Sequence, residues 1–149
     1  MSTTKKNEEY WKNRRIDWVQ HYWSPDHSHR SAIIEILKQH PVRSVLEIGC
    51  GAGANLYNIK KEFPDTAIAG CDINEDAIRT AREIFKNLTM GEKGNGPKEY
   101  EENPSRQELR VFGELHLKQA QLDDIEFKVG SADALPFHGD SFDLVLTDA

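Results

Sequence analysis

The residues best suited to chemistry in this sequence lie in the stretch Ser44–Leu56, SVLEIGCGAGANL. A short apolar run carrying one acid, Glu47, is followed by glycines at positions 49, 51 and 53. Glycine adopts left-handed backbone conformations readily, so this spacing predicts a sharp turn whose backbone can approach a ligand closely. The following helix would point its N–H groups back into the same place.

A second acid, Asp72, comes 23 positions after Gly49, at the end of the next apolar run. An acid at that position of a strand–turn–helix–strand unit accepts hydrogen bonds from ribose hydroxyl groups. The pair of features therefore predicts a ligand that contains a ribose. The alternative is a tight strand-to-helix turn that binds nothing.

Two classes of ribose-containing ligand fit the glycine loop. Gly49, Gly51 and Ala54 satisfy the loose dinucleotide pattern G-x-G-x-x-G/A, which would indicate an NAD-dependent oxidoreductase. Glu47 opposes that interpretation, because a carboxylate beside the loop repels a pyrophosphate by about a kcal/mol or more at short range. The same carboxylate favours a ligand with an ammonium group and a positive sulfur, and S-adenosylmethionine has both.

The elements that must position these residues follow from the spacing of apolar side chains. Helices are predicted at 8–23, 28–39, 54–63, 75–87 with Asn74 as its cap, and from a capping box at Ser105 and Glu108 to about Gln121. Strands are predicted at 45–48, 67–73, 125–130 and 142–147, and a loop at 89–104. Apolar strands separated by helices indicate an α/β domain built on a mostly parallel sheet. Ligands of such sheets bind at the carboxyl ends of the strands, where the glycine loop, Asp72, Asp133 and Asp148 fall.

Three segments resemble the successive motifs of class I S-adenosylmethionine-dependent methyltransferases: VLEIGCGAGANL, GCDINEDAIRTAR and GSADALPFHGDSFDLVLTDA. The resemblance covers roughly residues 42–85 and 125–149 and is specific as a combination. It implies a Rossmann-like sheet with flanking helices, S-adenosylmethionine as cofactor, and methyl transfer to an unidentified acceptor of small-molecule type. The alternative of another class is a non-catalytic module that binds the cofactor and needs a partner chain.

The resemblance also implies a role for each motif residue. The methionine end of the cofactor would be lined by Glu47 and by the backbone of Gly49, Cys50, Gly51 and Gly53. Asp72 would hold the ribose, and Ile73 would pack on the adenine. Asp133 would accept a hydrogen bond from the adenine amino group, with backbone contacts from Ala132 and Ala134. Thr147 and Asp148 would lie near the methionine moiety and the substrate entrance. An exposed acid that caps its own turn is the alternative for Asp133.

Residues 1–41 are expected to form a helical lid, and residues 42–149 the cofactor-binding domain. In related enzymes such helices cover the cofactor, and the candidate contacts here are Tyr22, Trp23, His29 and Arg30. A lid aromatic would attract the sulfonium by cation–π interaction, while an aromatic core stripe is the alternative. His27 and His29 lack a third ligand, so no metal site is predicted. Asp148 and His29 are conceivable general bases.

Two features depart from the family. Class I enzymes have a seven-stranded sheet, whereas only about four strands are predicted here, so we expect a truncated or split methyltransferase. Its fourth strand would be an apolar edge, open to a second copy or another chain. The segment 87–124 is longer than the usual connection and is expected to be a surface insertion, with a substrate or partner element as the alternative.

Composition limits the remaining function classes. The chain has 149 residues, suited to one domain, and 38% of them are hydrophobic. The net charge of −6 and the lack of a long basic block disfavour nucleic-acid binding. No apolar run approaches a membrane span and no secretory signal begins the sequence, so a cytoplasmic protein is expected. The cysteines, Cys50 and Cys71, are predicted to be small buried side chains, with a redox role as the alternative.

Overall fold

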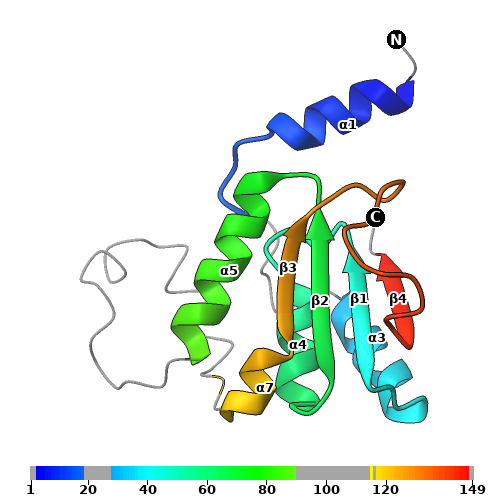
Figure 1. Ribbon diagram of the computed structural model, residues 1–149, viewed down its shortest axis with the longest axis vertical. Helices are drawn as coiled ribbons and strands as arrows, with labels where there is room; N and C mark the ends of the chain where they lie inside the picture. The colour runs from blue at the N-terminus through cyan, green and yellow to red at the C-terminus, as the bar shows by residue number, and fades with distance from the viewer. Residues whose placement is uncertain (1–2, 19–27, 90–114, 116, 148–149) are drawn as a thin grey trace.

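Four parallel strands form the centre of the computed structural model, which describes residues 3–18, 28–89, 115 and 117–147 (Figure 1). They are β1 (Ser44–Ile48), β2 (Ala67–Asp72), β3 (Ile125–Val129) and β4 (Leu144–Thr147). Their order in the sheet is β3-β2-β1-β4, and every neighbouring pair is parallel. The order reverses between β1 and β4, which is where ligands bind in such sheets. The predicted Rossmann-like α/β fold is confirmed, with β4 at an edge.

The strand register shows which residues of β1 and its neighbours share one face of the sheet. Val45 lies opposite both Ile68 of β2 and Leu144 of β4, and Glu47 lies opposite Gly70 and Leu146. Side chains of a strand alternate between faces, so Val45 and Glu47 point to the same face. Val45 and Ile68 are buried there, which stabilises the strands by roughly 1.5–3 kcal/mol per side chain.

Helices α4 (Ala54–Glu62) and α5 (Glu75–Thr89) pack against this sheet, and α3 (Ser28–Gln39) packs against α4. Figure 1 shows α3 and α4 behind the strands. Aromatic rings pack between the helices and β3. The ring centroid of Phe85 in α5 lies 4.9 Å from that of Phe127 and 6.1 Å from that of Tyr57 in α4. The predicted helix 28–39 coincides with α3, and Asn74 caps α5 as expected, because its Oδ1 accepts from the Ala77 N–H at 3.0 Å. None of the described helices combines the length and apolar character needed to span a membrane.

The first helix differs from its prediction. Helix α1 covers Thr3–Asn13 and ends there, rather than extending over 8–23. The carbonyl groups of Trp11 and Arg14, at the end of this helix, accept hydrogen bonds from Asn74 at 2.6 and 2.8 Å. The side chain that caps α5 therefore also satisfies carbonyls at the end of α1, and the chain turns toward the sheet.

The prediction of a helix that continues to about Gln121 is also wrong at its carboxyl end, which lies within the described residues. Lys118 has extended backbone angles, φ −73° and ψ 158°, and α7 (Gln119–Asp123) begins only after it. The Lys118 N–H donates to the Gln121 side chain at 2.9 Å, which fixes this start. Residues 90–114, with the predicted capping box and most of the proposed insertion, lie outside the described residues.

Candidate functional site

The glycine loop between β1 and α4 is anchored to β2. The N–H groups of Gly49 and Cys50 both donate to the Cys71 carbonyl, at 2.8 and 3.0 Å. The loop glycines 49, 51 and 53 all have positive φ, at 74°, 54° and 84°. A Cβ at Gly53 would lie only 3.0 Å from the Phe127 ring, whereas one at Gly49 would meet nothing within 4 Å. The loop is thus closed against the core at Gly53 and open at Gly49, as close approach of a ligand requires.

Asp72, at the end of β2, braces this loop. Its Oδ2 accepts from the Gly51 N–H at 2.9 Å, and its Oδ1 accepts from the Asn74 N–H at 2.8 Å. Burial raises the pKa of Asp72 above its usual value, and the N–H groups of Asn74, Gly51 and Ile73 oppose that rise. An ionised carboxylate has about four lone-pair sites, so each oxygen can accept a further hydrogen bond.

Glu47 is buried on the helical side of the sheet, with 2% of its surface exposed. Its Oε1 accepts from the Asn55 side-chain amide of α4 at 2.7 Å. The Asn55 oxygen accepts in turn from Arg30 Nε of α3 at 3.3 Å. These three side chains form a buried series from α3 through α4 to β1, which we call the Arg30–Asn55–Glu47 relay. Sequence reasoning missed Asn55, although a polar residue among the apolar positions of α4 was a signal.

The segment after α1 lies against the same loop. Trp18 is 5% exposed, and its ring would lie 3.7 Å from a Cβ at Gly51. Asn74 holds the Trp11 and Arg14 carbonyls, and Arg15 pairs with Asp76 at 2.9 Å. Helix α1 accordingly lies at the end of the molecule to which the strand arrows point (Figure 1). Trp18 is therefore an aromatic residue of the N-terminal segment that lies against the loop, whereas Tyr22 and Trp23 lie outside the described residues.

Burial of both cysteines is confirmed. Cys50 lies in the glycine loop and Cys71 in β2, and both are buried free thiols. Burial raises the pKa of Cys50 well above its ordinary value and raises that of Cys71 as well. Because the thiolate is the reactive form, these surroundings suit packing rather than nucleophilic chemistry.

The loop after β3 keeps its predicted residues on the surface. Asp133 is exposed, and its Oδ1 accepts a hydrogen bond from the Ser131 hydroxyl, while the Ala134 N–H donates to the Ser131 carbonyl at 3.1 Å. Asp133 therefore bonds a neighbouring side chain of its own turn, and its contact with an adenine stays a prediction. The other predicted residues are Ala132 (exposed), Ile73 (half-buried), Thr147 (exposed, ending β4), His29 (exposed, on α3) and Asp148, which lies outside the described residues.

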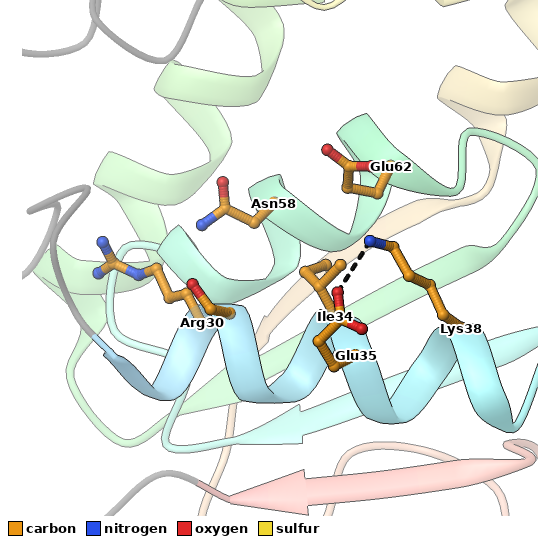
Figure 2. Close-up of a pocket in the computed structure, with 7 residues that line it drawn as sticks. Arg30, Ile34, Glu35, Lys38, Asn58 and Glu62 are labelled. Carbon is orange, nitrogen blue, oxygen red and sulfur yellow. Dashed lines mark hydrogen bonds and ion pairs between the residues drawn. The ribbon is translucent and has the colours of Figure 1, made fainter.

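A groove of about 310 Å³ lies between α3 and α4, away from the glycine loop (Figure 2). Its charges largely offset each other, since Lys38 pairs with Glu35 at 2.9 Å and Glu62 lies across from them. Arg30, at one end of the groove, belongs also to the Arg30–Asn55–Glu47 relay. The outer end of the relay therefore borders this groove, which is not lined by residues of the glycine loop.

A family model described as a methyltransferase domain matches residues 39–93. The matched range contains β1, the glycine loop, α4, β2 and α5. The resemblance to methyltransferases is confirmed over this range. A comparison with curated proteins gave no match.

Solved structures share the fold at low identity. The YcgJ protein of Bacillus subtilis is 20% identical, with 81% of this chain and 38% of that chain covered and a TM-score of 0.49. The PH0226 protein of Pyrococcus horikoshii is 23% identical, with coverages of 89% and 50% and a TM-score of 0.49. The plantazolicin methyltransferase BpumL, solved with SAH, is 17% identical, with coverages of 97% and 41% and a TM-score of 0.47. The chain spans half or less of each.

Proposed function

We propose that this chain binds S-adenosylmethionine at the carboxyl ends of β1 and β2 and serves in methyl transfer from it. The observation that carries the proposal is the placement of two carboxylates, Glu47 and Asp72, beside a loop of left-handed glycines within the range matched by the methyltransferase model. Carboxylates accept hydrogen bonds and attract cations, so this set suits a ligand with hydroxyl groups, an ammonium group and a positive sulfur.

Different residues of the site would bind different parts of the cofactor. Asp72 would accept from the ribose hydroxyls with the lone pairs that the Gly51 and Asn74 N–H groups leave open. Glu47 would offset the positive charge of the ammonium group, and the open backbone at Gly49 would allow close approach. Ile73, Ala132, Asp133 and Ala134 would contact the adenine, and Thr147 and Asp148 would border the substrate entrance.

The cofactor, when bound, supplies an electrophilic methyl group on a sulfonium. The protein must then align an acceptor with it and keep water out. Trp18 on the loop fits water exclusion, because it covers Gly51 with an apolar ring. We propose a small-molecule acceptor, and a general base is needed only if that acceptor must lose a proton.

A second candidate function is favoured by the exposed edge at β4. Val145 of this strand is exposed, and β4 has a strand neighbour on one side among the described residues. A cofactor-binding module that works with another chain, or with a second copy, would pair there. Methylation that depends on a co-purified chain would favour this candidate over independent catalysis.

Calorimetric titration of the 149-residue chain tests the proposal. The ligands are S-adenosylmethionine, S-adenosylhomocysteine and NADH. The variant Asp72→Ala removes the proposed ribose acceptor, and Asp123→Ala on α7 is the matched control, because α7 lies at the opposite end of the sheet (Figure 1).

We expect both sulfur ligands to bind, and Asp72→Ala to weaken them roughly tenfold or more, as loss of a hydrogen bond to a charged group predicts. Asp123→Ala should bind like the unsubstituted chain. A folded chain that binds neither sulfur ligand, or binds NADH in their place, would refute the proposal.

A further inference from the structure

We propose that Asn55 is a positioning residue for Glu47, and that through it α3 controls how the chain holds the amino-acid end of the cofactor. The inference rests on the proposed function. It concerns the Arg30–Asn55–Glu47 relay, whose members come from three different elements, α3, α4 and β1.

The polarity of the relay fixes the orientation of the Asn55 amide. Arg30 carries only donors, so the Asn55 oxygen must face it, which leaves the amide N–H groups for Glu47. A flipped amide would set donor against donor and acceptor against acceptor. All three side chains are more than nine-tenths buried, at 6%, 8% and 2% exposed, so water cannot readily take over these contacts.

The backbone around Asn55 ties it to the loop. Asn55 is the second residue of α4 and directly follows the glycine turn, where the Tyr57 N–H donates to the Gly53 carbonyl at 2.9 Å. The position of the amide relative to Gly49–Gly53 is therefore set by the first turn of the helix. Glu47, two residues before the loop, receives its hydrogen bond from the element that the loop leads into.

The electrostatic consequence is selective. Arg30 and the Asn55 amide together offset the charge of a carboxylate that has left water, and they direct its Oε1 into the protein. Losing the amide would change the direction and environment of the Glu47 carboxylate while leaving the Asp72 contacts with Gly51 and Asn74 in place. Binding of the ammonium group of the amino-acid end should suffer, and binding of the ribose and adenine should not.

The experiment compares three ligands on the same variants by calorimetry. S-adenosylmethionine and S-adenosylhomocysteine carry the amino-acid end, whereas 5′-methylthioadenosine keeps the nucleoside and sulfur but lacks it. Asn55→Leu removes the amide, and Asn58→Leu is the control, since Asn58 lies one turn later on α4 and lines the surface groove. Asn55→Asp, of nearly the same shape, is the second variant if leucine disturbs folding.

We expect both Asn55 variants to weaken the two amino-acid ligands about tenfold to a hundredfold, the range for a lost hydrogen bond to a charged group. Binding of 5′-methylthioadenosine should stay within about threefold, and Asn58→Leu should bind all three normally. Equal losses for all three ligands would show general damage to the loop and overturn the inference, as would no loss at all. If the unsubstituted chain binds no sulfur ligand, the proposed function fails first, and this inference fails with it.

Discussion

Replacing Asn74 with aspartate is expected to detach the N-terminal segment, α1 to Trp18, from the carboxyl edge of the sheet. Asn74 is fully buried and makes three side-chain contacts. Its amide donates to the Trp11 carbonyl at 2.6 Å and the Arg14 carbonyl at 2.8 Å, and its oxygen caps α5. Aspartate keeps the capping oxygen and loses both donors, so Asn74→Asp separates the attachment of α1 from the cap of α5.

The expected cost follows from these contacts. Two lost hydrogen bonds account for about 1–3 kcal/mol. The carboxylate also faces two carbonyl oxygens, which adds repulsion, so we expect Asn74→Asp to lower the free energy of unfolding by about 2–4 kcal/mol. Asn74→Ala removes the helix cap in addition to the two donors. It should therefore lower the free energy of unfolding by about 1 kcal/mol more than the loss of the two donors alone.

Urea unfolding measures the free energy, and hydrogen exchange of the amides in residues 11–18 measures release of the segment. The control is Asn13→Ala, an exposed asparagine of α1 whose amide donates to the Glu9 carbonyl at 2.9 Å. It should change stability by about 0.5 kcal/mol or less. Unchanged exchange in residues 11–18 of Asn74→Asp, with unfolding within about 0.5 kcal/mol of the unsubstituted chain, would refute this account of how α1 is held.

Two further predictions concern the core beneath the loop. Gly53→Ala should cost about 2–4 kcal/mol in urea unfolding, because φ is 84° and the new Cβ would lie 3.0 Å from Phe127, whereas Gly139→Ala, with open space around it, should be near neutral. A similar effect at both glycines would contradict the argument. Burial raises the pKa of Tyr57 from 10.0 to about 12, so its contribution to stability is full below pH 10 and is lost as pH rises toward 12. Across this range the free energy of unfolding should fall more steeply in the unsubstituted chain than in Tyr57→Phe, and equal slopes in the two proteins would contradict the effect.

Local chemistry explains what the sequence could predict. The apolar spacing in 28–39 predicts both ends of α3 correctly. The glycines at 49, 51 and 53 predict the turn, in which all three have positive φ. Asn74 was identified as a helix cap because that contact reaches only three residues ahead, to Ala77. The position of Asp72 at the end of β2 followed from the end of an apolar run in the same way.

Contacts between distant residues explain what it could not. The end of α1 at Asn13 depends on Asn74, which lies 63 and 60 positions from the carbonyls it holds. The spacing of aromatic residues in 8–23 carries no information about that contact, so it predicts a helix that ends later than the observed one. Asn55 likewise gains its role only from Arg30, 25 positions earlier, and Glu47, 8 positions earlier.

Asp72 shows how a predicted ligand residue can serve the fold at the same time. Its two oxygens are already oriented by the N–H groups of Gly51 and Asn74, so a ribose would meet an acceptor that needs no reorganisation. For the same reason, Asp72→Ala removes a brace of the loop along with a ligand contact. Asp72→Asn keeps the size of the side chain but sets a donor against one of the two backbone N–H groups, so it weakens both the brace and the ligand acceptor while leaving Glu47 unchanged. If weakened binding of S-adenosylmethionine in that variant is matched by weakened binding of 5′-methylthioadenosine, the defect lies at the ribose and loop rather than at Glu47.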